Sequence, residues 1–171
     1  MRIAERNELI EADVVFLTAD YDGGLPLIAQ LLPEAGIDPE LVQYVGLSQW
    51  DVLPSAFHLP GIQGGWFAMP SPTRAEQFRD RFQSVYGNAP HPLAAIAYDG
   101  VAAVGASVAT GNRDALNSKG LTLTGGFQGA AGIFRLRNNG TLERGLAVAT
   151  IEGNQVVVLD EAPRTFSNFG F

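Results

Sequence analysis

The chain of 171 residues contains no cysteine, a single lysine and no long apolar run. The absence of cysteine excludes disulfide bonds, thiolate catalysis and cysteine-ligated metal sites. Lys119 stands beside ten arginines, and the net charge is −7. This charge argues against nucleic acid or an anionic membrane as a partner, because both need clustered basic side chains. No run reaches the roughly 18 apolar residues of a membrane-spanning helix.

Residues for catalysis or metal binding are also scarce. The only histidines, His58 and His91, lie beside prolines without companion ligands at a metal-binding spacing, which favours surface or loop positions. No G-x-S-x-G motif is present, and the glycine-rich run 125–132 lacks the Lys-Ser/Thr of a phosphate-binding loop. Asp20 and Asp22 are too close in sequence for a glycosidase pair. We therefore predict a non-catalytic protein without a metal or cofactor.

The composition, with 46% hydrophobic and 17% charged residues, is typical of a folded globular protein. Val14–Leu17 is a short apolar run, which predicts a strand buried on both faces. The polar, glycine-rich segment Thr18–Gly24 follows, and a helical pattern begins at Leu25. In open α/β sheets, ligands bind where such strands end.

The rest of the pattern predicts an α/β fold in which strands and helices alternate before a β-rich C-terminal end. The expected helices are Leu25–Leu32, Thr73–Tyr86, Leu93–Ala109 and a short Asn112–Ser118. The further expected strands are Leu41–Leu47, Gln63–Met69, Ile133–Arg137, Leu146–Ile151 and Gln155–Leu159. Residues 1–11 are typical of the end of a polar helix, and residues 162–171 of an irregular tail.

Prolines, glycines and capping residues set the expected helix limits. Pro26 suits a first helical turn, Pro33 should stop or kink the same helix, and Gly36 offers a left-handed exit. Thr73 and Glu76 have the spacing of a capping box, with Ser71-Pro72 as an alternative start. Gly87 should close this second helix. Leu93–Ala109 is apolar nearly all round, which predicts a helix enclosed by other elements.

Three polar and aromatic groups are candidates for ligand contact. Asp20 and Tyr21 fit either an ordinary turn or a ligand loop in which the tyrosine packs and the carboxylate accepts hydrogen bonds. Trp50 with Asp51 fits either a core residue or a stacking surface beside a carboxylate. Tyr98, followed by Asp99, fits either a satisfied core tyrosine or an orienting residue at a cleft.

Several blocks of the sequence, taken in order, resemble a known family. They are Asp13–Gly24, Phe82–Gly87 with Ala97–Ala102, and Gly126–Phe134 continuing through Asn139-Gly140 to Val148. Together they are similar to the C-terminal half of type I periplasmic binding proteins of the leucine/isoleucine/valine-receptor kind. Gln49-Trp50-Asp51, Gln63–Phe67 and Glu143-Arg144-Gly145 resemble most closely the branch of penicillin-binding protein activators.

The resemblance implies a three-layer, Rossmann-like type I fold of two lobes joined by three crossovers, with a small ligand between them. Residues 1–69 and 139–171 would belong to the second lobe and residues 70–138 to the first. Asp20 and Tyr21 match a ligand-contacting loop. Ser48 stands where amino-acid receptors place an acid for the ligand's ammonium group, and Asp51 is the alternative for that role. With Trp50 and Tyr98 added from the residue patterns above, the predicted ligand-contacting residues are Asp20, Tyr21, Ser48, Trp50, Asp51 and Tyr98.

The resemblance also bears on partners, location and length. The implied partner is an amino-acid-like small molecule presented to an ABC transporter, or a cell-wall synthase in the activator branch, whose members are lipoproteins. Both would be periplasmic, although residues 1–11 have no apolar region of a signal peptide. The family is roughly twice as long, so we expect a fragment, with apolar faces uncovered on Leu93–Ala109 and self-association as a result.

Overall fold

The computed structural model of the chain describes residues 12–21, 23–47, 50–111 and 114–166. The chain forms two compact units: unit 1 comprises Met1–Met69 and Val148–Asp160, and unit 2 comprises Pro70–Ala147 and Glu161–Phe171. It therefore passes from one unit to the other three times. The expected boundary after residue 69 coincides with this division, whereas 139–147 and 161–166 belong to the same unit as 70–138. The helix expected in 1–11 and the tail beyond 166 lie outside the described residues.

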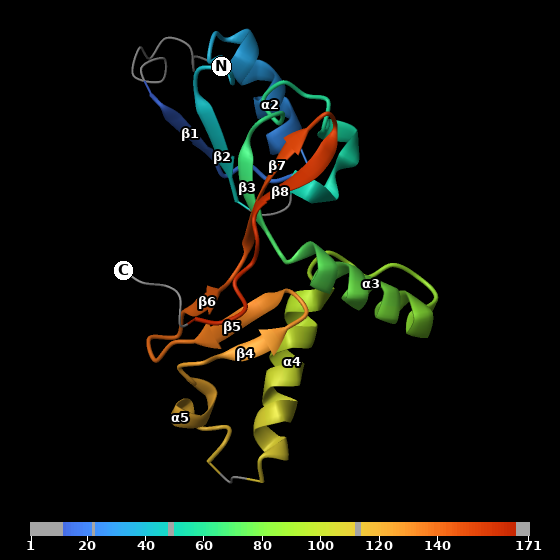
Figure 1. Cartoon of the computed structure of the whole chain (residues 1–171), viewed down its shortest axis with the longest axis vertical. Helices are drawn as coiled ribbons and strands as arrows, with labels where there is room; N and C mark the ends of the chain where they lie inside the picture. The colour runs from blue at the N-terminus through green and yellow to red at the C-terminus, as the bar shows by residue number, and fades with distance from the viewer. Residues whose placement is uncertain (1–11, 22, 48–49, 112–113, 167–171) are drawn as a thin grey trace. The chain divides into compact units, whose positions relative to one another are not determined.

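Unit 1 contains a five-stranded sheet with the order β1-β2-β3-β7-β8 (Figure 1). Its parallel strands are β1 (Val14–Leu17), β2 (Gln43–Gly46) and β3 (Trp66–Met69). The hairpin of β7 (Ala147–Glu152) and β8 (Gln155–Asp160) is antiparallel. A parallel βαβ start followed by a β-rich end confirms the predicted α/β class.

Helix α2 (Gly24–Glu34) connects β1 to β2 and forms the core of unit 1 with the sheet. Pro26 lies in its first turn, Pro33 in its last, and Gly36 leaves the helix with a φ of 91°, as predicted. The helix buries a stripe of Leu25, Ala29 and Leu32. The other large side chains of this core include Ile37, Tyr44, Ile62, Phe67 and Ile151.

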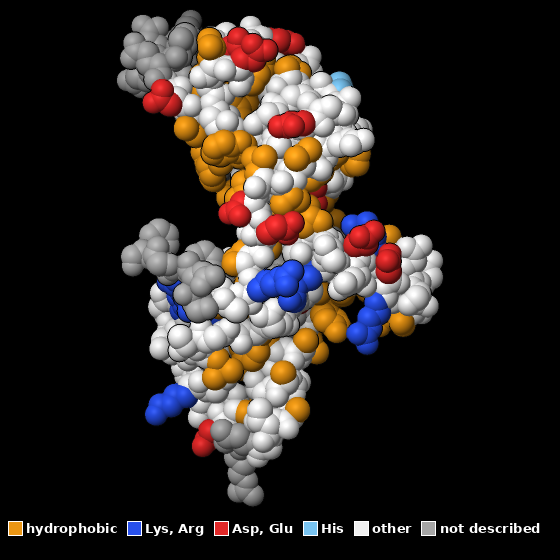
Figure 2. Space-filling model, in the orientation of Figure 1, with side chains coloured by type: hydrophobic (Ala, Val, Ile, Leu, Met, Phe, Trp, Pro, Cys, Tyr) orange, Lys and Arg blue, Asp and Glu red, His pale blue; other side chains and the backbone are white. Residues whose placement is uncertain are grey.

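The prediction that β1 is buried on both faces is wrong. Val14 and Phe16 are 53% and 56% exposed, whereas Leu17 is buried. The reason is the position of β1 at the edge of the sheet, where alternate side chains point to opposite faces and only one face packs on the core. Apolar side chains gather on this part of the surface of unit 1 (Figure 2).

Unit 2 combines helices with a small antiparallel sheet of order β4-β5-β6 (Figure 1). Its strands are β4 (Phe127–Gly129), β5 (Gly132–Leu136) and β6 (Leu142–Arg144), and α4 (Ala94–Ala109) lies against β4. β5 and β6 form an antiparallel hairpin whose turn contains Asn139-Gly140, a sequence typical of such turns. The glycine-rich run 125–132 contains β4 and the tight turn Ala130-Ala131.

Helix α3 (Pro72–Tyr86) confirms the predicted helix Thr73–Tyr86, with one correction at its start. Ser71 is the N-cap and Pro72 the first helical residue, so the alternative start is the observed one, and no side-chain cap bond forms. Gly87, with a φ of 75°, ends the helix. The short helix expected at 112–118 is wrong: α5 (Ser118–Leu121) begins only at Ser118, and Asn117 caps it by accepting a hydrogen bond from the Gly120 amide at 3.1 Å.

The apolar pattern of α4 predicted a helix enclosed between other elements, and this is wrong. The other expectation, that apolar faces of this helix are uncovered, is confirmed. Its only buried residues are Asp99, Ala103 and Ser107, one narrow stripe at intervals of four. The larger apolar side chains of the helix lie outside that stripe and are exposed. None of the helices in the described residues is both long and apolar enough to cross a membrane.

Candidate functional site

The polar loops after β1 and β2 lie at the same edge of the unit 1 sheet. The two strands are parallel, and Leu17 at the end of β1 pairs with Gly46 at the end of β2. Asp20 is exposed and Tyr21 half-buried. The Asp20 carbonyl accepts a hydrogen bond from the Leu25 amide at 2.8 Å, which ties the loop to the start of α2. This edge is where α/β sheets bind small ligands.

Trp50 begins the 3₁₀ helix η1 (Trp50–Val52) and is a core residue, only 2% exposed. Its ring stacks on Phe67 with centroids 5.8 Å apart. A Cβ added to Gly46 or Gly65 would lie 2.3 or 2.5 Å from the ring, so both positions require glycine. The core alternative of the sequence prediction is therefore the observed one. The stacking alternative is corrected, because the ring is enclosed by its own unit.

The structure describes only some of the other candidate residues. Asp51 is half-buried in η1, one residue after the buried tryptophan. Ser48 and Asp22 lie outside the described residues. A ligand-binding role for Asp20, Tyr21, Ser48 and Asp51 stays a prediction.

Tyr98 lies on α4, and therefore in unit 2. Its ring is about half exposed and packs against Phe78 of α3 with centroids 5.3 Å apart. This exposure does not fit the alternative of a satisfied core tyrosine. Of the predicted residues that the structure describes, Asp20, Tyr21, Trp50 and Asp51 therefore lie in unit 1 and Tyr98 lies in unit 2.

Asp99, the neighbour of Tyr98, is the polar anchor of unit 2. It is 1% exposed. One carboxylate oxygen accepts a hydrogen bond from the Ala130 amide at 2.5 Å, and the other accepts from the Ala131 amide at 3.2 Å and pairs with Arg144 at 2.7 Å. The carboxylate is thus satisfied by the β4–β5 turn and by β6. Its role is to fix α4 against the sheet.

A cavity of about 1130 Å³ lies within unit 2. Its walls come from α3, the first turns of α4, the β4–β5 turn and residues 161–164. Arg74 donates hydrogen bonds to the Gly129 carbonyl at 3.0 Å and to the Gln128 side chain at 2.8 Å. Aromatic rings of α3 and Arg81 complete the lining. This cavity was not predicted from the sequence, although Arg74, Phe78 and Phe82 recur at intervals of four.

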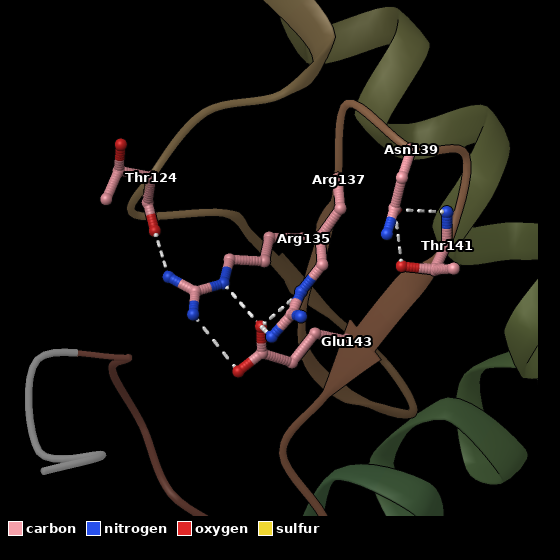
Figure 3. Close-up of polar contacts among 6 residues, drawn as sticks. All are labelled: Thr124, Arg135, Arg137, Asn139, Thr141 and Glu143. Atoms are coloured by element: carbon pink, nitrogen blue, oxygen red, sulfur yellow. Dashed lines mark hydrogen bonds and ion pairs between the residues drawn. The ribbon is translucent and has the colours of Figure 1, made fainter. Parts of the chain in front are cut away.

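A cluster of opposite charges joins β5 and β6 (Figure 3). Arg135 and Glu143 face each other across the strands and form two hydrogen bonds, at 2.8 and 3.1 Å. Arg137 also pairs with Glu143. Hydrogen bonds from Arg135 and Arg137 hold the pKa of Glu143 below its usual value. Since its members satisfy one another, the cluster stabilises the hairpin and presents no unpaired group for chemistry.

The two histidines are exposed, as predicted. The His91 ring accepts a hydrogen bond from the Leu93 amide at 3.1 Å, which is a local turn contact. Within the ranges that the structure describes, no three His, Asp or Glu side chains lie close enough to hold a metal ion.

Comparisons with known proteins converge on one fold. Residues 8–155 match the profile of a family described as periplasmic binding protein. One similar crystal structure, from Rhodospirillum rubrum, carries the provisional description of a branched-chain amino acid ABC transporter. It has a TM-score of 0.68 and 20% identity, and the match covers 86% of this chain and 44% of that one. No match was found among curated protein sequences.

Two further structures differ from each other in what they do. The LivJ substrate-binding protein of Streptococcus pneumoniae, solved with isoleucine, has a TM-score of 0.56 and 20% identity, covering 88% of this chain and 45% of that one. The LpoA C-domain of Haemophilus influenzae, a regulator of PBP1A, has a TM-score of 0.55 and 17% identity, covering 91% of this chain and 46% of that one. The chain thus spans less than half the length of each of these proteins.

Proposed function

Because the chain belongs to the periplasmic binding protein family, we propose that it is part of a non-catalytic receptor that binds a small polar ligand, such as an amino acid or an amide, between two lobes. The receptor would act in the periplasm and deliver the ligand to an ABC transporter. One observation carries the proposal. Asp20 and Tyr21 follow β1 at the sheet edge where β2 also ends, and the exposed carboxylate and half-buried ring can contact a ligand there.

The proposed contact combines two kinds of interaction. The Asp20 carboxylate would accept charge-assisted hydrogen bonds from an ammonium or amide group. The Tyr21 ring would cover the apolar part of the ligand and donate through its hydroxyl group. Isoleucine, the ligand of the similar LivJ structure, has both an ammonium group and an apolar side chain, which makes it the first ligand to test.

The test is calorimetric titration of the full-length receptor that contains this chain with isoleucine, leucine, valine and small amides, accompanied by thermal unfolding. Tyr21→Ala should weaken binding by about tenfold, which corresponds to the loss of roughly 1.4 kcal/mol of ring contact. Tyr86→Ala is the matched control, because Tyr86 is an exposed tyrosine of α3 in the other unit. If no ligand of the panel gives heat or thermal stabilisation, the receptor proposal fails.

The second candidate is a protein-interaction module that regulates peptidoglycan synthesis. The burial of Trp50 favours it, because this removes a large ring from the proposed ligand surface. The similarity to the LpoA C-domain supports the same candidate. Capture of a cell-wall synthase from membranes that persists in Tyr21→Ala and Asp51→Ala variants would support a surface outside the sheet edge. Loss of capture in both variants would contradict it.

A further inference from the structure

The tip of the β5–β6 hairpin carries a sequence with a reactivity of its own. Asn139 is the only asparagine of the chain that is followed by glycine. The side chain of an asparagine can react with the backbone nitrogen of the next residue, and a glycine there has no side chain to hinder the approach. Asn139 and Gly140 are both exposed, so water reaches the two reacting groups.

The backbone of this turn is well defined on both sides of Asn139. The Arg137 amide donates a hydrogen bond to the Thr141 carbonyl at 2.9 Å, and the Gly140 amide donates to the Arg137 carbonyl at 3.0 Å. Gly140 has a φ of 81°, the left-handed conformation that closes a hairpin loop of this kind. Asn139 is thus presented to solvent on a fixed frame, and only the single turn bond of Gly140 must open before its nitrogen can react.

Thr141 holds the side chain of Asn139 by two hydrogen bonds (Figure 3). The Asn139 carbonyl oxygen Oδ1 accepts from the Thr141 amide at 3.0 Å and from the Thr141 hydroxyl at 2.7 Å. The bond to the amide two residues on folds the side chain back over the Gly140 peptide. Two donors on one carbonyl oxygen also stabilise the negative charge that develops there when its carbon is attacked. Among the residues that the structure describes, the Asn139 amide nitrogen Nδ2 has no hydrogen-bond partner to retain it.

We propose that Asn139 is a site of spontaneous covalent modification in the folded protein, which converts it to aspartate and isoaspartate, and that Thr141 activates its carbonyl group. The Gly140 nitrogen forms a bond to Cγ of Asn139, the bond from Cγ to Nδ2 breaks, and Nδ2 leaves as ammonia with the proton that the Gly140 nitrogen has lost. Water then opens the cyclic imide. Cleavage between the nitrogen and Cγ gives aspartate, and cleavage between the nitrogen and the main-chain carbonyl carbon gives isoaspartate. The proposal concerns unit 2 alone and is independent of the ligand-binding proposal.

The two products should affect the hairpin differently. Aspartate keeps the length of the main chain and adds a negative charge to the turn. Isoaspartate carries the main chain through the former side chain, which inserts a methylene group before Gly140. The bond between Arg137 and Thr141 closes the turn, and Arg137 also pairs with Glu143. The isoaspartate form should therefore weaken this end of the hairpin and unfold at a lower temperature than the unmodified protein.

Peptide mapping by mass spectrometry tests the modification in the full-length protein that contains this chain. During incubation at mildly alkaline pH, the mass gain of an amide converted to an acid should accumulate at Asn139. It should not accumulate at Asn138, an exposed neighbour that is followed by a residue with a side chain. The rate should rise with pH, because the Gly140 nitrogen must lose its proton, and Asn139→Gln should abolish the gain over the same period. An unmodified Asn139, or an equal gain at Asn138, would overturn the proposal.

Thr141→Val tests the role of Thr141, because valine keeps the branched shape and the backbone amide but lacks the hydroxyl donor. Loss of an activating bond should slow the modification by about three- to tenfold. If Thr141 only held the turn closed, its loss would free the side chain and leave the rate unchanged or raise it, and either result would overturn its activating role.

Thr122→Val is the matched control for Thr141→Val. The Thr122 hydroxyl donates to the Asn138 side chain at 3.1 Å, so this variant loses a hydroxyl bond to the neighbouring asparagine instead. The rate at Asn139 should be unchanged in it, and circular dichroism should show the native fold for both variants. Equal slowing in the two variants would contradict a specific role for Thr141.

Discussion

Helices α2 and α4 have similarly apolar sequences, yet they bury opposite kinds of side chain. α2 buries Leu25, Ala29 and Leu32 against the unit 1 sheet. α4 buries Asp99, Ala103 and Ser107, and its valines are exposed. Both stripes have the three- or four-residue intervals of one helical face. The periodicity of a sequence therefore identifies the helix, but it does not identify the face that is buried.

The two helices are consequently held by different forces. Burial of large apolar side chains stabilises α2, and this force has no directional requirement. α4 depends on the Asp99 carboxylate, whose partners come from the β4–β5 turn and from β6. Hydrogen bonds fix direction as well as distance. The single residue Asp99 therefore sets the position of α4 on the sheet, whereas the buried residues of α2 are apolar and form no such directional contacts.

The largest expected effect is that of Asp99→Ala. The substitution leaves Arg144 and two backbone amides of a buried site without their acceptor, which should cost about 3–5 kcal/mol of unfolding free energy. Urea denaturation followed by circular dichroism measures this cost. Asp80→Ala provides the control, because Asp80 is an exposed residue of α3 and its removal should change stability by less than about 0.5 kcal/mol. Equal costs for the two variants would contradict the anchor role of Asp99.

A smaller loss, about 3 kcal/mol, is expected for Leu32→Ala in α2, because a buried leucine leaves a cavity. Leu27→Ala, an exposed position of the same helix, is the control. Val104→Ala in α4 should cost no more than about 0.5 kcal/mol at concentrations where the chain is monomeric. Denaturation midpoints of the three variants give the comparison. A Val104→Ala cost approaching that of Leu32→Ala would show that the α4 face is covered within one chain.

The smallest effects concern the pH dependence of stability. Unit 1 should lose stability at high pH, and unit 2 at low pH. Tyr44 in unit 1 donates a hydrogen bond to the Ile37 carbonyl at 2.7 Å, and burial, aided by Asp38, raises its pKa to about 12. The folded state therefore favours the protonated phenol. Its contribution to stability is complete below pH 10 and is lost as the pH rises through about 12.

Glu143 in unit 2 behaves in the reverse way, because its pKa is lowered in the folded state. Its contribution is present above the ordinary glutamate pKa and is lost as the pH falls through the lower folded value. Both tryptophans lie in unit 1, so their fluorescence should report alkaline loss of unit 1, and Tyr44→Phe should remove that pH dependence. Glu143→Gln should reduce the loss of stability at low pH, measured as the acid-induced loss of the circular dichroism signal. Unchanged profiles in these variants would assign the pH dependence to other groups.

Sequence patterns predicted the elements whose signals are local. Pro26 and Gly36 are near the ends of α2, and Gly87 ends α3, because these residues act through their own backbone geometry. The hairpin at Asn139-Gly140 was predictable for the same reason. The capping box of α3 was not observed, since Ser71-Pro72 offered a competing start.

Features that depend on distant residues were not predictable. Asp99 meets Arg144 from 45 positions away, and no spacing rule connects the two. The burial of Trp50 depends on Gly46 and Gly65, which only the fold brings to its ring. At the candidate site, parallel pairing confirms that the loops after β1 and β2 share an edge, but the half-buried state of Tyr21 required coordinates.

The chain crosses between its two units three times, and this affects how it folds during synthesis. Strand β3 is complete at residue 69, but its neighbour β7 begins at Ala147, after nearly all of unit 2. At ribosomal rates of about 5–20 residues per second, the β3 edge stays unpaired for several seconds. An unpaired edge is a template for intermolecular strand pairing. The nascent chain should therefore depend on chaperones most strongly in the interval between these two strands.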